Sequence, residues 1–154
     1  MITFLLAQAG IVALVLLTIA SHLCYSSEIP FQKEDTSLSA GQFHTCAIEA
    51  RVGITYGGPI KCFGYNGMGQ ASPPPGMFIQ VSSGHSHTCA IRTDQRIACW
   101  GAISKPPNQY FNQISSGELH TCGVLRNGEV LCWGHNDFGE SSPPGGTFQQ
   151  VRNT

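Results

Sequence analysis

Residues Ser115–Gly134 read SSGELHTCGVLRNGEVLCWG, and this stretch decides the fold. The same phrase stands at Ser82–Gly101 as SSGHSHTCAIRTDQRIACWG, and a looser copy at Ser39–Gly64 reads SAGQFHTCAIEARVGITYGGPIKCFG. Each copy holds a His-Thr-Cys triplet and a second cysteine that is followed by an aromatic residue and a glycine. Self-similarity at such a period, with strand-like segments and no helical periodicity, indicates a repeat architecture.

The third copy predicts its own hairpin register. If Cys122 lies opposite Cys132, then Leu125 faces Glu129 and the turn is Arg126-Asn127-Gly128. A three-residue turn of this kind takes glycine in third place, where the backbone needs a positive φ. The cysteine pairing and the turn chemistry therefore agree.

The other two copies depart from this turn. In the second copy the same pairing gives the turn Thr93-Asp94-Gln95, which places glutamine where glycine is preferred. We therefore expect some strain at Gln95. The first copy has six more residues between its cysteines, several of them Gly and Pro, which predicts a longer loop.

Alternation along the strands gives the third hairpin two largely apolar faces. One face carries His120, Cys122, Val124, Val130 and Cys132, and the other carries Thr121, Leu125, Leu131 and Trp133. Small sheets stacked face to face around an axis, as in a β-propeller, cover both faces of such a hairpin. We predict an all-β fold, a partial β-propeller of three blades, with a stacked β-solenoid as the lesser alternative. Loops rich in Gly, Asn, Ser and Pro lead to further short strands, expected at Met77–Val81, Tyr110–Ile114 and Thr147–Val151.

The N-terminal segment is a nearly unbroken apolar run without charge from Ile2 to Leu23. It predicts a hydrophobic helix within residues 1–26, acting as a signal peptide or a signal anchor, with a buried core helix as the third interpretation. Residues 27–37 are polar and read as a linker. The repeat domain is expected at 38–154, with repeats at about 38–81, 82–114 and 115–151, and it is placed outside the cell or in a lumen.

The cysteine pattern predicts three disulfides. Six of the seven cysteines pair within the copies, and Cys24 is left in the apolar segment. Opposed cysteines on antiparallel strands lie close enough to be bridged, and an even number behind an export segment favours oxidation. A Zn²⁺ site of one histidine and two cysteines per copy is the competing interpretation, without a C-x-x-C motif to support it. We predict no metal, no cofactor and the bridges Cys46–Cys62, Cys89–Cys99 and Cys122–Cys132.

The repeated phrase resembles the short, cysteine-bearing repeats of the regulator-of-chromosome-condensation superfamily over about Leu38–Val151. Within that superfamily it is similar to the β-lactamase inhibitor protein II branch and to extracellular propellers of some plant receptor kinases. The resemblance implies a β-propeller whose loops bind other proteins. Three copies are fewer than the blades of a closed ring, and the second copy carries Ala102–Asn108 in place of the N-x-x-G-[EQ] loop.

No catalytic centre is evident in the sequence. His44, His87 and His120 recur with the repeat, and we interpret them as structural residues that donate a ring N–H to the backbone of a neighbouring blade, with a ligand role as the alternative. The serines recur in the same way, and no G-x-S-x-G motif is present. The loop carboxylates form no evident acid–base pair; they are Asp94, Glu118, Asp137 and Glu140.

The loops after the second cysteines of copies one and three are the candidate partner-binding residues. Aromatic residues and Met among Asn and Gly suit protein recognition; the alternative is that Phe138 and Met68 pack into the blade below. The candidate residues are Tyr65, Asn66, Met68, His135, Asn136, Asp137 and Phe138.

These observations predict a non-enzymatic extracellular or lumenal protein-binding module. The alternatives are an inhibitor of a secreted hydrolase and a guanine-nucleotide-exchange regulator as in the nuclear branch of the superfamily. We expect protein partners, including self-association or another repeat chain. A net charge of −1 argues against nucleic acid, and a membrane is expected only through an uncleaved N-terminal segment.

Overall fold

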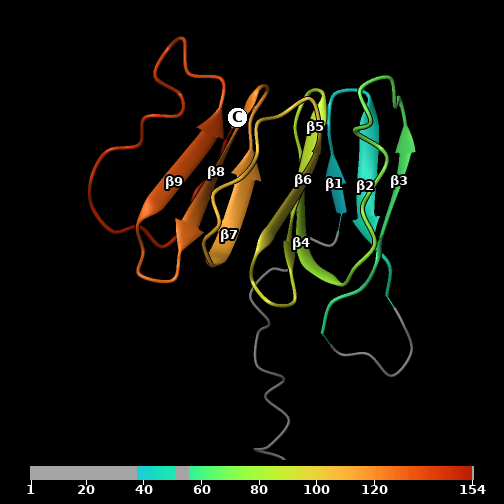
Figure 1. Ribbon diagram of the computed structural model, residues 1–154, viewed down its shortest axis with the longest axis horizontal. Helices are drawn as coiled ribbons and strands as arrows, with labels where there is room; N and C mark the ends of the chain where they lie inside the picture. The colour runs from blue at the N-terminus through green and yellow to red at the C-terminus, as the bar shows by residue number, and fades with distance from the viewer. Residues whose placement is uncertain (1–37, 51–55, 154) are drawn as a thin grey trace, which may run out of the picture. The chain divides into compact units, whose positions relative to one another are not determined.

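Three small antiparallel sheets, which stand side by side across Figure 1, make up the part of the chain that the structure describes. This computed structural model describes residues 38–50 and 56–153. The strands are β1 (Leu38–Ala40), β2 (His44–Ile48), β3 (Ile60–Gly64), β4 (Phe78–Ser83), β5 (His87–Arg92), β6 (Ile97–Gly101), β7 (Phe111–Ser116), β8 (His120–Leu125) and β9 (Val130–Gly134).

Two expectations about the N-terminal segment fall outside these residues. The hydrophobic helix predicted within residues 1–26 and the linker at 27–37 both lie outside the described part of the chain. Within residues 38–50 and 56–153, no helix has the length and apolar character needed to cross a bilayer.

Each sheet consists of a lead strand followed by a hairpin. The order is β1-β2-β3 in the first sheet, β4-β5-β6 in the second and β7-β8-β9 in the third, with every neighbouring pair antiparallel. The lead strands β4 and β7 run across the expected boundaries between sequence repeats, at 81/82 and 114/115. Each of these two sheets therefore joins the end of one sequence repeat to the hairpin of the next.

The hairpin registers are those that the cysteines and turns predict. In the third sheet Cys122 pairs with Cys132, and the N–H of Leu125 donates to the carbonyl of Glu129 at 2.8 Å. Gly128 has a φ of +86° in the third position of that turn. Gln95 holds the equivalent place in the second sheet with a φ of +67°, which confirms the expected strain, because a side chain is disfavoured in that region.

Three disulfides close the hairpins. The bridges are Cys46–Cys62, Cys89–Cys99 and Cys122–Cys132, with Cα–Cα separations of 4.1, 4.1 and 4.0 Å. The sulfurs that the zinc interpretation needed are therefore bonded to one another. Among the described residues, no group of three or more His, Cys, Asp or Glu side chains is placed to hold a metal ion.

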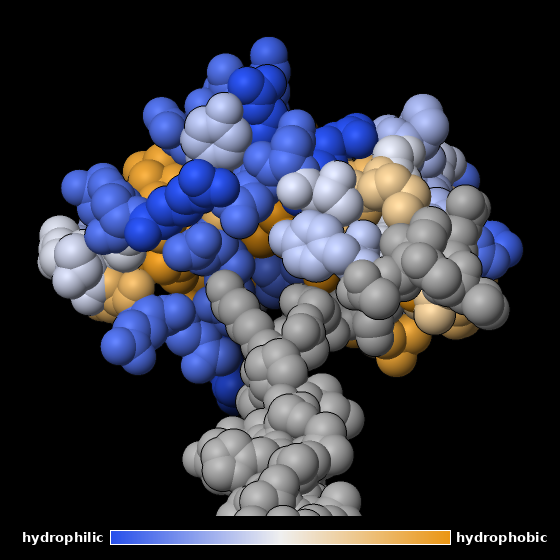
Figure 2. Space-filling view, turned by 90° about the horizontal axis from the view of Figure 1, so that it is seen from below, coloured by the Kyte–Doolittle hydropathy of each residue, from blue (hydrophilic) through white to orange (hydrophobic). Residues whose placement is uncertain are grey.

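The core lies in the two seams between successive sheets. Phe78, Val81 and Trp100 of the second sheet pack on Cys46 and Ile60 of the first. The seam between the second and third sheets repeats four of these positions with Cys89, Phe111, Ile114 and Trp133, and it also buries Ile91. Seen from below, apolar side chains reach the surface in separate patches among polar ones (Figure 2).

The repeated histidines join one sheet to the next. The Nε2 atom of His44 lies 2.7 Å from Oγ1 of Thr88, and that of His87 lies 2.9 Å from Oγ1 of Thr121. We expected these rings to bond to the backbone of the neighbouring blade, and this was wrong. Their Nε2 atoms bond instead to the side-chain hydroxyl of the threonine in the next His-Thr-Cys triplet. Burial lowers the pKa of His87 to about 4, so this imidazole is neutral at pH 7. A Cβ on Gly84 would meet the His87 ring at 2.4 Å, which accounts for the glycine three residues earlier.

The expected strand at Thr147–Val151 does not form a ladder in the described part of the chain. A strand needs a hydrogen-bonded neighbour, and no described segment runs beside this one as a hairpin partner. Instead the N–H of Val151 donates to Oε1 of Gln113 at 2.9 Å, which holds the segment against the third sheet.

Candidate binding loops

Two loops of the same construction follow the third strands of the first and third sheets. Residues 65–76 read YNGMGQASPPPG and residues 135–146 read HNDFGESSPPGG. They follow β3 and β9, whose arrows point toward the top of Figure 1. In the first loop the Asn66 side chain accepts from the N–H of Ala71 at 2.9 Å and donates to Ser72 at 2.8 Å. Asn136 makes the equivalent bonds in the second loop. The two asparagines therefore brace the loops.

The tips of both loops expose large apolar side chains. Met68 is 61% exposed and Tyr65 is 57% exposed in the first loop, and Phe138 is 92% exposed in the second. The alternative in which Met68 and Phe138 pack into the blade is therefore wrong. A fixed loop with an exposed apolar tip can offer contact area to a partner with little loss of conformational freedom.

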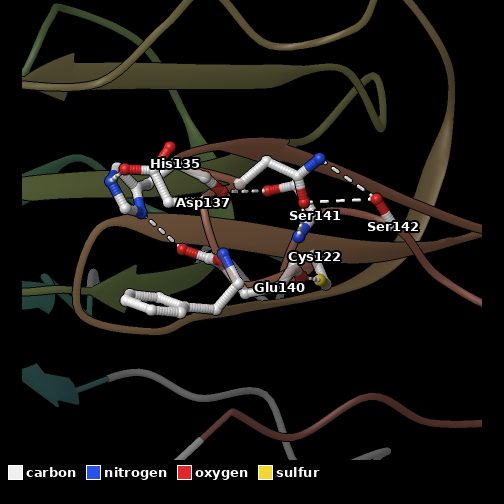
Figure 3. A network of polar contacts seen from close by, with 8 residues as sticks. Cys122, His135, Asp137, Glu140, Ser141 and Ser142 are labelled. Carbon is white, nitrogen blue, oxygen red and sulfur yellow. Dashed lines mark hydrogen bonds and ion pairs between the residues drawn. The ribbon is translucent and has the colours of Figure 1, made fainter.

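A histidine between two carboxylates organises the second loop. Nδ1 of His135 lies 2.5 Å from Oε1 of Glu140, and its Nε2 lies 3.1 Å from Oδ2 of Asp137. Figure 3 shows the His135 ring and the Glu140 carboxylate pointing toward each other on one side of the view, with Ser141 and Ser142 on the other side. The other oxygen of Glu140 accepts the N–H of Phe138 at 2.9 Å, which fixes the backbone that carries the exposed ring.

The charges of this cluster reinforce one another. The hydrogen bond to Glu140, helped by the charge of Asp137, raises the pKa of His135. The hydrogen bond from His135, helped by backbone donors, lowers the pKa of Glu140 to about 2. No acid–base pair was evident among the loop carboxylates in the sequence, but Asp137 and Glu140 both contact His135, because the turn folds residues two and five positions away onto one imidazole. Glycine and glutamine stand at the positions of these carboxylates in the first loop.

The first loop is anchored by Gln70, a residue that no sequence motif indicated. Gln70 is 1% exposed, and its backbone carbonyl accepts from Oγ1 of Thr88 at 3.1 Å and from the indole Nε1 of Trp100 at 2.8 Å. Its side-chain oxygen accepts the N–H of Met68 at 2.9 Å. The sequence holds one sign of this role: Gln70 aligns with Glu140 when the two loop sequences are aligned.

The second sheet lacks this anchor. Its loop is shortened to residues 102–110, and no counterpart of Gln70 stands between β6 and β7. The indole Nε1 of Trp133, which corresponds to that of Trp100, is buried and finds no hydrogen-bond acceptor among the described residues. The departure of the second copy from the repeat therefore leaves a buried donor unpaired.

Comparison with known proteins identifies the repeat. The regulator of chromosome condensation (RCC1) repeat matches residues 78–102 and 111–140. The chain carries RCC1 repeats. The matched segments hold the second and third sheets with their lead strands, and the second of them extends to Glu140 at the tip of the second loop. No curated protein sequence matches the chain.

Solved structures similar to this RCC1-repeat chain include two plant receptor ectodomains. The ectodomain of the Arabidopsis thaliana receptor kinase ACR4 is 27% identical with a TM-score of 0.62, covering 80% of this chain and 44% of that one. The ectodomain of the Physcomitrella patens receptor kinase CR4 is 30% identical with a TM-score of 0.62, covering 75% and 34%. Prp20p of Saccharomyces cerevisiae is 17% identical with a TM-score of 0.54, covering 75% and 34%.

These likenesses establish the fold more than the function. The RCC1-repeat chain spans less than half the length of each of the three structures. Prp20p, whose structure was described together with its binding to Gsp1p and histones, shares the fold alone at this identity. The described residues therefore form an all-β fold of the kind seen in propeller proteins.

Proposed function

We propose that this chain is a non-enzymatic protein-binding module that works in an extracellular or lumenal setting. The observation that carries the proposal is the pair of braced loops with exposed tips, above all Phe138, which is 92% exposed. The candidate residues divide by role. Tyr65, Met68 and Phe138 contact the partner, whereas Asn66, Asn136, His135 and Asp137 fix the loop conformation.

Two observations support the setting. Disulfides persist where the environment is oxidising, and this small domain has three. Two similar structures are ectodomains of receptor kinases. Neither alternative function, the hydrolase inhibitor or the nucleotide-exchange regulator, is favoured by these comparisons. The similarity to Prp20p, which binds Gsp1p and histones, supports protein partners in general.

Site-specific photocrosslinking tests the proposal. A photoreactive phenylalanine analogue is placed at Phe138, at Met68, or at Asn127, which is exposed at the opposite end of β9, and the protein is produced in its native cellular setting. We expect one defined adduct from the two loop positions and none from Asn127, with loss of the adduct from position 68 when Phe138→Ser is added. The proposal fails if all three positions give the same adducts or if neither loop position gives one.

Thiol labelling tests the setting separately. Alkylation of intact protein before and after reduction counts the free thiols among the six repeat cysteines. We expect all six to be protected until reduction, whereas six free thiols in material isolated from its native compartment would contradict an oxidising setting.

A further inference from the structure

The outer edge of β6 is an unpaired strand edge. In the second sheet, whose order is β4-β5-β6, only one side of β6 faces a neighbouring strand. The N–H of Arg92 donates to the carbonyl of Arg96 at 2.9 Å, and bonded and unbonded pairs alternate along an antiparallel ladder. The backbone groups of Ile97 and Cys99 therefore point away from β5, and they make no hydrogen bond to a described residue outside the sheet.

A cleft follows this edge. Its volume is about 430 Å³, within the range of about 300–1,000 Å³ that is usual for ligand sites. One wall is formed by residues 96–99 and the other by residues 105–108 of the shortened connection to β7. Pro106 and Pro107 have no N–H, so the middle of the second wall has no donor to offer β6. An open edge of this kind can accept an extended segment of another chain.

The cleft carries positive charge on both walls. Arg96 stands on one wall and Lys105 on the other, and both are exposed. Neither forms an ion pair with a carboxylate of residues 38–50 and 56–153. Oδ1 of Asp94 accepts the backbone N–H of Arg96 at 3.0 Å instead. The cleft therefore presents two cations, and no carboxylate is among its lining residues.

The guanidinium group of Arg96 is held by an aromatic neighbour. It lies 5.6 Å from the centroid of the Tyr110 ring, and its Nη2 donates to the Tyr110 hydroxyl at 3.5 Å. Arg126, in the turn of the third sheet, lies 5.4 Å from the same centroid, and its Nε donates to the side-chain oxygen of Gln95. These contacts restrict both guanidinium groups, so less conformational freedom is lost when an anion binds.

We propose that this cleft binds an extended acidic segment of a partner protein, which adds to β6 as a further strand. The inference rests on the proposed function as a protein-binding module and names the chemistry of the segment. The backbone groups of Ile97 and Cys99 pair with the segment, and its carboxylates meet Arg96 and Lys105. Because side chains alternate along a strand, acidic residues in every second position place their carboxylates on one face.

Labelled peptides test the charge preference. The probe is a fluorescein-labelled octapeptide of alternating threonine and glutamate, and the control peptide has lysine in place of glutamate. By fluorescence anisotropy at low salt, we expect the glutamate peptide to bind at least about tenfold more tightly than the lysine peptide. Its affinity should fall as salt is added, because the cations are exposed. Equal affinity for the two peptides, or no binding of either, overturns the inference.

Charge reversal tests the location of the site. Arg96→Glu combined with Lys105→Glu should weaken the glutamate peptide at least about tenfold and should bind the lysine peptide instead, which also shows that the variant is folded. Lys61→Glu combined with Arg152→Glu makes the same change in net charge outside the cleft. We expect this matched control to keep the wild-type affinity. An equal loss in both variants contradicts the assignment to the cleft.

Amide hydrogen exchange tests the strand addition. The amides of Ile97 and Cys99 should exchange more slowly when the glutamate peptide is bound, because they then donate to its carbonyl groups. Binding that leaves both exchange rates unchanged excludes pairing along β6. None of the loop residues probed by photocrosslinking lines the cleft, so failure of the proposed loop surface and failure of this inference give different results.

Discussion

The two buried tryptophans form a matched pair for a stability experiment. Trp100 and Trp133 occupy equivalent positions on β6 and β9 and are 9% and 6% exposed. The indole of Trp100 donates to the carbonyl of Gln70 at 2.8 Å, whereas the indole of Trp133 has no acceptor in the described part of the chain. Replacing each with Phe removes the same atoms but has a different effect on hydrogen bonding.

The difference can be estimated from these contacts. Both substitutions lose similar packing, so that contribution largely cancels between them. Trp100→Phe also loses a buried hydrogen bond, worth about 1 kcal/mol net. Trp133→Phe instead removes an unpaired buried donor, whose desolvation penalty is about 1–3 kcal/mol. We therefore expect Trp100→Phe to lower the free energy of unfolding by about 2–4 kcal/mol more than Trp133→Phe.

Urea unfolding with the disulfides intact measures this difference. Far-ultraviolet circular dichroism and the fluorescence of the remaining tryptophan should give coincident transitions for each variant. The expected order of midpoints is Trp133→Phe above Trp100→Phe, with equal slopes. If Trp133→Phe is as destabilising as Trp100→Phe, Trp133 has an acceptor and the argument from the shortened loop is wrong.

Three further outcomes are expected. Replacing Cys122 and Cys132 together with Ser should lower the free energy of unfolding by about 3 kcal/mol, the loop-entropy value for a bridge over this separation; chemical denaturation measures it, and an unchanged midpoint contradicts it. His87 binds a proton near its ordinary pKa of 6.5 in the unfolded chain, but only near pH 4 in the folded chain. The free energy of unfolding should therefore fall by about 3 kcal/mol as the pH drops through that interval. Denaturation at several pH values checks this, and His87→Gln should flatten the dependence of stability on pH. The ion pair of His135 and Glu140 should be fully formed between pH 4.5 and 6.5, the ordinary pKa values of the two groups. It is lost as the pH rises through the raised pKa of His135, or as the pH falls toward the lowered pKa of Glu140. Proton NMR of the His135 ring measures both limits, and Glu140→Gln should bring the pKa of His135 back down.

The hairpins were predictable from the sequence because their determinants are local. Cys122 and Cys132 pair only in a register that puts Gly128 at the positive φ of the turn, so two independent patterns give one answer. Gln95 shows the same logic, because the register forces the turn even where its third residue is unfavourable. The alternation of side chains then sets the two faces of each sheet.

Contacts between sheets were less predictable. The partner of His87 is Thr121, which lies 34 residues away, and nothing in a period-two pattern shows which residue of the next sheet faces the ring. The position of Gln70 has the same cause, since its carbonyl bonds to residues of the next sheet. The cluster around His135 was missed for a different reason: a loop without periodicity gives no rule for which side chains turn inward.

One pattern of two bonds joins Ser83 to Ser39, Ser116 to Ser82 and Asn153 to Ser115. This repeated pattern bears on how such a chain can change in length. Because Ser82–Ile114 is bounded by the same bonding pattern at both ends, a gene segment encoding one unit could be duplicated or deleted and still leave matching edges. Recombination would then alter the number of units without any new contact having to arise by point mutation. The shortened loop of the middle unit would travel with it, so a duplicated middle unit would also duplicate the unpaired indole.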